Sequence, residues 1–282
     1  MLKCQEICYS YPGQEKAILK NITLSIPAQK KSALIGRNGS GKSTLLLLAA
    51  GLYQPQQGNL YWGEEVLKCD RKSLSRWRQR IGLAFQDPEQ QLVAGTVAED
   101  ISYGLYNLEL PQAEIELRLQ QALTDFGLQE LADRPLHHLS LGQKRRVALA
   151  GVMALKPQLL LLDEPTTYLD KLQIDNLLKE LDRIHAAGTT AVMATHDLNL
   201  AYEWADWIWI LHEGQMVMEG ETQDVFARRE LMEKIQVGSP ILWEVWDTLC
   251  PEIIPNANLP FPKTIRELQE RLLEYKEDTE IR

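Results

Sequence analysis

The chain has 282 residues, a net charge of −9 and 45% hydrophobic residues, which is enough apolar material for a large core. The acidic balance argues against nucleic acid as a partner, because duplex binding relies on many Lys and Arg contacts to phosphate. Four scattered cysteines form no CxxC pair and are too sparse for a disulfide framework, which favours a reducing compartment. We expect neither a signal peptide nor a bilayer-spanning run, so any membrane association has to go through a partner.

The first part of the chain predicts strands and then a strand–loop–helix unit. Apolar residues alternate over 7–11 and 19–26, as they do in half-buried strands, and a turn is expected at Pro12-Gly13. The short apolar run 32–35 precedes a glycine-rich loop, and a helix is expected over 44–50. This order makes the loop a candidate phosphate-binding site.

The middle of the chain alternates apolar runs with helical patterns. The run 159–162 contains only leucine, which suits a strand that is buried in a parallel sheet. Leucine and isoleucine recur among polar residues over 97–155, which predicts helix there. The remaining elements expected are a strand at 81–85, a helix at 174–184, a strand at 189–194, a helix at 198–204, and strands at 208–211 and 216–219 joined by a turn at Glu213-Gly214.

Composition changes late in the chain. We therefore expect one main domain over 1–227 and a C-terminal extension over 228–282. The segment 238–262 carries five prolines, and Thr264-Ile-Arg-Glu267 fits a capping box that opens a last amphipathic helix. The apolar face of that helix, over 264–276, can pack either on its own domain or on a partner subunit.

The glycine-rich loop is the first motif that carries chemistry. Residues Gly36–Ser43, GRNGSGKS, match the pattern G-x-x-x-x-G-K-[ST], in which backbone N–H groups and a helix N-terminus surround anionic phosphates. Lys42 can reach the β- and γ-phosphates, and the Ser43 hydroxyl can bind Mg²⁺. Kinases, GTPases and ATPases share this motif, so alone it indicates only a nucleotide binder. The nucleotide-binding residues expected here are Gly36, Asn38, Gly39, Ser40, Gly41, Lys42, Ser43 and Thr44.

Two acids follow the leucine run. Asp163 and Glu164 stand at the carboxyl end of the expected strand, where ligands bind in open α/β sheets. Asp163 is the candidate Mg²⁺ ligand, and Glu164 is the candidate base that orients and deprotonates the attacking water. The plain alternative is a solvated strand end, which is less favoured because the pair follows a phosphate loop.

Between these motifs lies Leu139-Ser-Leu-Gly-Gln143, and here the sequence resembles the ABC ATPases, whose signature is usually LSGGQ. The resemblance covers about residues 1–225. It implies an α/β fold with a RecA-like core, an antiparallel β subdomain and an α-helical subdomain at about 87–156. It also implies that the chain hydrolyses ATP with Mg²⁺ and pairs with a second ATPase subunit across the bound nucleotide.

The resemblance assigns roles to further residues. Tyr11 is expected to stack on adenine, and His196 to contact the γ-phosphate. Gln86 is expected to contact Mg²⁺ and water and to sense the membrane partner. Ser140, Gly142 and Gln143 are expected to bind the nucleotide held by the opposite subunit, and Asp170 to contact that subunit. A helix N-terminus at Ser140 suits an anion, so ATP would hold two subunits together and its hydrolysis would release them.

Two positions depart from the family pattern. Leu141 replaces the first glycine of the signature, and we expect the backbone donor at Gly142 to survive because a side chain at 141 can point away. Tyr168 stands where a small residue is usual. Leu141 suggests a binding module without catalysis as an alternative, and the intact catalytic positions named above argue against it.

Three stretches, Phe85–Leu92, Thr96–Asp100 and Gly142–Gly151, resemble the ATPases of energy-coupling factor (ECF) importers, including the cobalt and nickel branch. In that family the segment after the glutamine receives a helix of a transmembrane coupling protein, and a separate membrane component binds the cargo. The resemblance implies a peripheral ATPase at the cytoplasmic face of the cell membrane, with cobalt or nickel as the first cargo and a vitamin as the alternative. A soluble ABC ATPase acting on ribosomes or DNA is the rival hypothesis.

Overall fold

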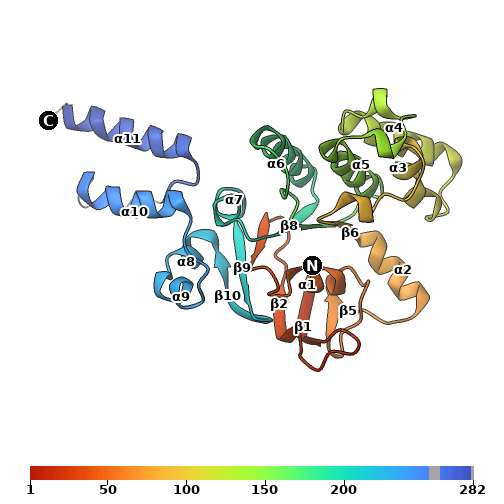
Figure 1. Ribbon diagram of the computed structural model, residues 1–282, viewed down its shortest axis with the longest axis horizontal. Helices are drawn as coiled ribbons and strands as arrows, with labels where there is room; N and C mark the ends of the chain where they lie inside the picture. The colour runs from red at the N-terminus through yellow and green to blue at the C-terminus, as the bar shows by residue number, and fades with distance from the viewer. Residues whose placement is uncertain (254–260, 281–282) are drawn as a thin grey trace.

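The computed structural model describes residues 1–253 and 261–280, which form two sheets and flanking helices (Figure 1). The larger sheet has the order β10-β9-β3-β8-β7-β6, with β3 (Ser32–Ile35), β6 (Ile81–Ala84), β7 (Leu159–Asp163), β8 (Thr190–Thr195), β9 (Trp207–His212) and β10 (Gln215–Glu221). The smaller sheet has the order β2-β1-β4-β5, with β1 (Leu2–Tyr9), β2 (Leu19–Ser25), β4 (Gln57–Trp62) and β5 (Glu65–Val66).

The helices connect and cover these strands. They are α1 (Lys42–Ala49), α2 (Arg71–Arg80), α3 (Val97–Tyr106), α4 (Gln112–Asp125), α5 (Leu141–Ala154), α6 (Lys171–Ala186), α7 (Leu198–Trp204), α8 (Thr222–Phe226), α9 (Arg229–Lys234), α10 (Ile241–Ile253) and α11 (Ile265–Glu280). Across the described ranges, none of them combines the length and the apolar character that a bilayer span requires.

The leucine run of β7 is buried because both faces of the larger sheet are covered. Leu159 and Leu161 belong to one apolar cluster, which includes α1 and the smaller sheet. Leu160 and Leu162 point to the other face and join a second cluster with residues of α3–α7. Side chains alternate along a strand, so a strand covered on both sides needs apolar residues at every position. The expected buried parallel strand is confirmed.

The strands from β6 to β9 run parallel, so their carboxyl ends meet at one edge of the sheet. The register places Asp163 of β7 opposite Ala194 of β8, and Ile35 of β3 opposite Thr195 of β8. The chain that leaves each of these strands therefore starts within one small region. This region receives the glycine-rich loop, the acid pair and the segment after Thr195.

The stretch 97–155, expected to be helical, contains three α-helices and two short 3₁₀ helices (Figure 1). Thr96 opens α3 with a capping box, in which Glu99 accepts from the Thr96 backbone. Pro111 precedes α4, and Gly127 follows it with φ +60°, a left-handed conformation that suits the end of a helix. The group α3–α5 lies at one end of the molecule in Figure 1.

Several elements were absent from the expectations. The β4–β5 hairpin and the short helices α8 and α9 are too brief for a periodic pattern, and α2 buries only Ser73 and Trp77. Among the boundaries that differ, two concern the site. β1 ends at Tyr9, so Tyr11 lies beyond the strand, and α1 begins at Lys42, because Gly41 takes the left-handed N-cap position with φ +106°.

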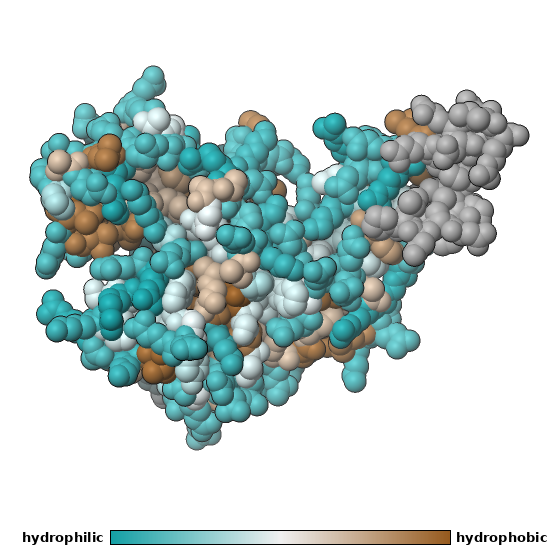
Figure 2. Space-filling view, turned by 180° about the vertical axis from the view of Figure 1, so that it is seen from behind, coloured by the Kyte–Doolittle hydropathy of each residue, from teal (hydrophilic) through white to brown (hydrophobic). Residues whose placement is uncertain are grey.

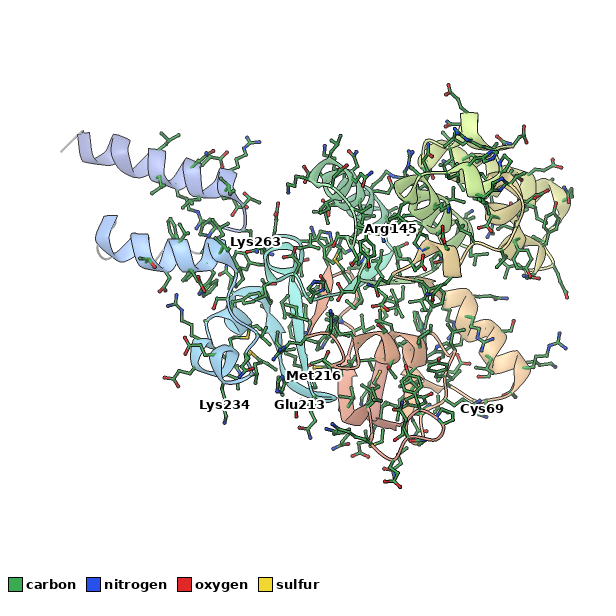
Figure 3. The ribbon with its side chains drawn as sticks, viewed as in Figure 1. Cys69, Arg145, Glu213, Met216, Lys234 and Lys263 are labelled. Atoms are coloured by element: carbon green, nitrogen blue, oxygen red, sulfur yellow. The ribbon has the colours of Figure 1, made fainter. Side chains whose placement is uncertain are left out.

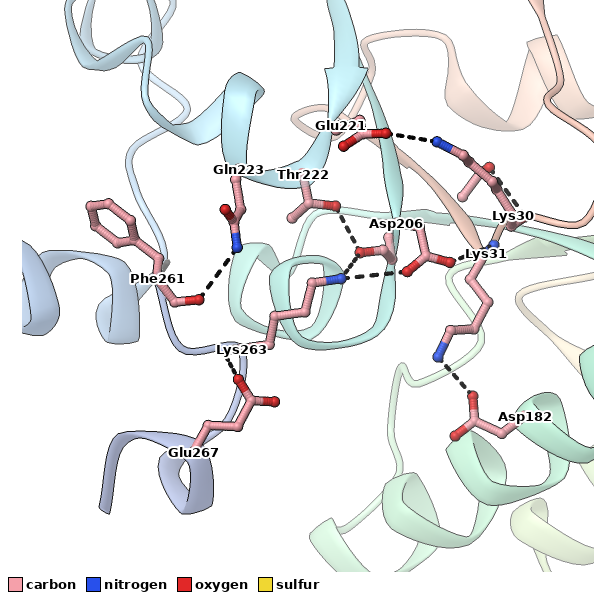
Figure 4. Close-up of polar contacts among 12 residues, drawn as sticks. Lys30, Lys31, Asp182, Asp206, Glu221, Thr222, Gln223, Phe261, Lys263 and Glu267 are labelled. Atoms are coloured by element: carbon pink, nitrogen blue, oxygen red, sulfur yellow. Dashed lines mark hydrogen bonds and ion pairs between the residues drawn. The ribbon is translucent and has the colours of Figure 1, made fainter. Parts of the chain in front are cut away.

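The start of the last helix is fastened to its own chain (Figure 4). Lys263 Nζ donates to Ala205 O at 2.7 Å and lies 3.5 Å from Asp206 Oδ1, and the Tyr202 hydroxyl donates to Pro262 O at 3.0 Å. The ring of Phe261 stacks on Trp243, with centroids 3.6 Å apart. These contacts support packing of the extension on its own domain, and they do not test contact with a second subunit.

The extension also shares a core with the residues before it. Trp243 is 3% exposed and contacts the rings of Phe226 and Tyr202 edge-on or tilted. Met232 and Ile235 belong to the same apolar cluster. The domain boundary near Ala227 therefore stays a prediction, since buried residues on both sides of it pack together.

Trp243→Ala tests this shared core. We expect it to lower the free energy of unfolding by about 3–5 kcal/mol, because it removes a buried ring and leaves a cavity. Urea unfolding followed by circular dichroism measures the change. Ile241→Ala on the same helix is the control, since Ile241 is 65% exposed and its loss should cost less than about 0.5 kcal/mol. Equal stability of the two variants would show that the extension does not belong to the cooperative core.

Candidate functional site

A pocket of about 470 Å³ opens at the carboxyl edge of the larger sheet. The connections after four strands of this sheet contribute to its walls: the glycine-rich loop after β3, Gln86 after β6, Glu164 after β7 and His196 after β8. Ten of the residues expected at a nucleotide site line it, namely Tyr11, Asn38, Gly39, Gly41, Lys42, Ser43, Thr44, Gln86, Glu164 and His196. Ligands of open α/β sheets bind at this edge, so the position agrees with the sequence pattern.

The glycine-rich loop curls around the side chain of Lys42. Gly39 and Gly41 have φ values of +82° and +106°, which only glycine adopts readily. Lys42 is buried, and its Nζ donates to Gly36 O at 2.7 Å. Ser40 is buried as well. The loop thus places the Lys42 ammonium at the N-terminus of α1. Both this positive charge and the helix dipole favour the binding of an anion there.

Three charged or titratable side chains form a line across the pocket. Lys42 Nζ lies 3.0 Å from Glu164 Oε1, and Glu164 Oε2 lies 2.9 Å from His196 Nδ1. Glu164 is 6% exposed, and its φ of +44° is rare for a residue with a side chain. Glu164 therefore has a strained backbone conformation at the position where its carboxylate lines the pocket. The predicted base and the predicted switch histidine are therefore neighbours.

Asp163 lies beside this line and is 8% exposed. Burial raises the pKa of its carboxyl group, whereas a hydrogen bond with Ser43 acts in the opposite direction. Its Oδ1 has no hydrogen-bond partner among the described residues. A buried carboxylate oxygen that lacks a protein partner, a serine hydroxyl and the Gln86 amide are oxygen donors of the kind that Mg²⁺ prefers. The residues present fit a magnesium ion.

Tyr11 borders the pocket from the side of the smaller sheet. Its hydroxyl lies 2.9 Å from Thr44 Oγ1, which ties it to the first turn of α1. Its ring meets Tyr9 and Tyr53 edge-on, with centroids 5.4 and 5.9 Å apart. The ring packs against its neighbours and also lines the pocket, and its role in stacking on adenine stays a prediction.

The signature residues lie outside this pocket. Ser140 caps α5, where its Oγ accepts from Gln143 N at 3.3 Å and its own N–H donates to Gln143 Oε1 at 2.9 Å. Asp170 caps α6 in the same way, accepting from Gln173 N at 2.8 Å. Ser140, Gly142 and Gln143 border a separate pocket of about 500 Å³ between α5 and α6. The structure therefore does not bring them to the phosphate loop of their own chain.

Three residues of this region were not expected in the site, although Tyr168 was noted as a departure from the family pattern. Thr167 and Tyr168 also line the phosphate pocket, and Tyr168 is 84% exposed with φ +65°. Arg145 belongs to a run of three cations, Lys144 to Arg146, that reads as a solvent-facing charge cluster, yet it is 8% exposed. No local pattern could have shown that its side chain points inward.

Comparison with known proteins agrees with this geometry. The model of the ABC transporter family matches residues 19–167. A protein of Nostoc sp., assigned by name to the ATP-binding proteins of ABC transporters, is 55% identical over 88% of this chain and 90% of its own. The cobalt import ATP-binding protein CbiO of Rhodobacter capsulatus is 41% identical over 86% of each chain. An ECF transporter ATP-binding protein, EcfA of Carboxydothermus hydrogenoformans, is 35% identical over 97% of this chain and 98% of its own.

Solved structures show the same likeness. CbiO1 of Clostridium perfringens, described as part of the ABC transporter complex CbiONQ, aligns with a TM-score of 0.74 and 35% identity over 88% of this chain and 98% of its own. The dimeric bacterial ABC transporter cassette MJ0796 aligns with a TM-score of 0.71 and 28% identity over 79% and 99%. Family model, relatives and fold agree, and the chain thus belongs to the ABC transporter family as an ATP-binding subunit with the ATPase fold of that family.

Proposed function

We propose that this chain is one of two ATPase subunits that energise an ECF-type importer, with a transition-metal ion, cobalt or nickel, as its cargo. The observation that carries the proposal is the line from Lys42 through Glu164 to His196 inside the phosphate pocket, with Ser140 outside it. The pocket has the groups for hydrolysis, whereas the signature residues need a nucleotide held by another copy. The names of CbiO and EcfA support the metal ion and the importer type.

ATP binding would use the loop and the edge of the smaller sheet. The N–H groups of the loop and the N-terminus of α1 would hold the phosphates, with Lys42 at the β- and γ-phosphates and the Tyr11 ring beside adenine. Asn38, Gly39 and Thr44 also line the pocket. Ser43, Gln86 and Asp163 would hold Mg²⁺, which supplies charge neutralisation at the phosphates when bound.

Hydrolysis would then depend on Glu164. In the structure Glu164 Oε1 is engaged by Lys42, 3.0 Å away. A γ-phosphate would attract the Lys42 ammonium and release this oxygen, so that it can orient a water and accept its proton. His196 Nδ1 lies 2.9 Å from the other carboxylate oxygen, and in the proposed mechanism His196 would also contact the γ-phosphate. The contact between His196 and Glu164 fixes the orientation of the Glu164 carboxylate.

Pairing would complete the site. Ser140 and Asp170 cap the N-termini of α5 and α6, and a Cβ built on Gly142 would lie 3.2 Å from Gln173, so the two helix starts are adjacent. Helix N-termini favour an anion, which in a pair would be the γ-phosphate bound by the other subunit. The dimeric cassette MJ0796 supports such a pair. ATP would hold the two subunits together until it is hydrolysed.

The membrane partner would dock beside Gln86. The segment Gln86–Leu92 follows β6 and begins the α3–α5 side of the molecule, where Figure 2 shows apolar surface. Val93, Tyr103 and Tyr106 are large, exposed side chains of this part. A helix of a transmembrane coupling protein would cover it and hold the ATPase at the cytoplasmic face of the membrane, and a separate membrane component would bind the cargo. A vitamin stays the alternative cargo.

Uptake assays test the cargo and the class of protein together. Vesicles that contain this chain with its membrane components should accumulate radioactive cobalt or nickel when ATP is supplied on the side of this chain. ATP-dependent uptake of a vitamin, without uptake of a metal ion, would identify a vitamin as the cargo. Hydrolysis that is stimulated by ribosomes or DNA, with no uptake of any solute, would favour the soluble ABC ATPase instead.

Glu164→Gln should abolish turnover and keep nucleotide binding. Loss of the base lowers kcat by about 10²–10⁴-fold, while the phosphate loop is unchanged. Phosphate release gives the rate, and titration with a fluorescent ATP analogue gives the affinity. Glu116→Gln on α4 is the matched control, because Glu116 is exposed and remote from the pocket. Equal rates for wild type and Glu164→Gln would favour a binding module without catalysis.

Tyr11→Ala should weaken ATP binding about two- to tenfold, as expected for the loss of one aromatic stacking contact. Tyr11→Phe keeps the ring and removes only the hydroxyl contact with Thr44, so its affinity should stay near that of wild type. Calorimetric titration with ATP measures both variants. Equal weakening in the two would assign the effect to the hydroxyl and would contradict stacking.

Gln90→Trp should reduce copurification with the transmembrane coupling protein, because a bulky ring would obstruct the docking segment. Gln90 is exposed, so the fold should tolerate the change. Gln112→Trp at the exposed start of α4 introduces the same ring elsewhere and should have no effect. Unchanged assembly and unchanged uptake in the Gln90 variant would place the membrane contact on another surface.

A further inference from the structure

Arg145 is a buried cation whose role the proposed mechanism does not include. It lies in the second turn of α5, the helix that Ser140 opens, and its side chain reaches the junction between the α3–α5 group and the larger sheet (Figure 3). Its Nη2 donates to Gln86 O at 2.9 Å, and its Nη1 donates to Pro165 O. One guanidinium thus joins α5 to two separate connections.

The environment of Arg145 is costly for a charge. Burial lowers the pKa of its guanidinium, and the negative charge of Asp87 opposes that effect. Within the described part of the chain, no carboxylate lies within ion-pair distance of it, and its Nε is buried without a hydrogen-bond partner. A buried charge is expensive unless its hydrogen bonds are specific, so the two carbonyl contacts are the features that justify its presence.

The two acceptors are next to catalytic positions. Gln86 follows β6 and lines the phosphate pocket with its own side chain. Pro165 directly follows Glu164, whose backbone is held at φ +44°. A hydrogen bond to a carbonyl fixes the peptide group on that side of the residue. Arg145 therefore restrains two peptide groups at once, the one that follows Gln86, an expected Mg²⁺ ligand, and the one that follows Pro165, one residue beyond the expected base Glu164.

We propose that Arg145 is a positioning residue that holds the Gln86 and Glu164 connections against α5, so that a displacement of this helix changes the placement of both catalytic groups together. The inference rests on the proposed function of the pocket. It gives the surface beside Gln86 a physical connection to the site of hydrolysis. The planar fork of arginine spans the two carbonyls, which a lysine ammonium, as a single point, does not.

Kinetics of Arg145→Met and Arg145→Lys test the proposal. In the methionine variant kcat should fall at least about tenfold, because displacement of a catalytic group by about 1 Å can cost up to about 100-fold. KM for ATP should change less than about twofold, since the loop that binds phosphate is untouched. The Mg²⁺ concentration for half-maximal rate should rise, because Gln86 is displaced. The lysine variant should recover part of the rate, because it can still reach one carbonyl.

Arg118→Met is the matched control. Arg118 lies on α4, pairs with Glu114 and touches neither connection, so its loss should leave kcat and the Mg²⁺ requirement unchanged. Hydrogen exchange of the folded proteins gives a second readout without activity. Arg145→Met should speed exchange in 86–92 and 165–169 and leave β3 and β9 as protected as in wild type.

The outcomes separate the two proposals. A folded Arg145→Met protein with wild-type kcat, Mg²⁺ requirement and exchange would overturn the positioning role. A loss of activity that follows a general loss of protection, with no recovery by lysine, would show a merely structural residue and would overturn it as well. Wild type that hydrolyses no ATP, and equals Glu164→Gln, would instead refute the proposed function on which the inference rests.

Discussion

The parallel register of β3, β7 and β8 is the constraint on which the rest of the structure depends. Because these strands run in one direction, their carboxyl ends meet at one edge, and three segments far apart in sequence begin there. The leucines of β7 secure this register, since alternate residues belong to apolar clusters on opposite faces of the sheet. The pocket at this edge is therefore a consequence of how the core is packed.

Electrostatics within the pocket follow from that packing. Lys42, Glu164 and His196 come from three different connections, and burial brings the first two within 3.0 Å of each other. In a region with little water such a pair interacts strongly, so an incoming polyanion competes with Glu164 for the lysine. In the proposed function, the arrival of phosphate would free Glu164 to act as the base. The same site leaves Asp163 with an oxygen that has no protein partner among the described residues.

The signature residues and the C-terminal extension lie away from the phosphate pocket. Ser140 and Asp170 form capping contacts within their own helices, away from the phosphate pocket, and the α5 helix contacts that pocket through the carbonyls held by Arg145. We infer that the two parts of α5 have different roles: its N-terminus would bind the nucleotide of a second copy, and Arg145 in its second turn would position groups of its own site. The extension after Phe226 packs on the opposite flank, where Trp243 and Phe261 join the core around Tyr202.

The sequence by itself determined the phosphate loop, the acid pair, the buried strand and most helices, because each depends on local spacing and periodicity. It also pointed to Lys42, Glu164 and His196, whose roles stay predictions although the structure places them together. The distances between them, the inward direction of Arg145 and the packing of Trp243 were decided only by the tertiary structure. Such features depend on which distant segments meet, and a run such as Lys144–Arg146 is the same in sequence whether its middle residue faces water or the core.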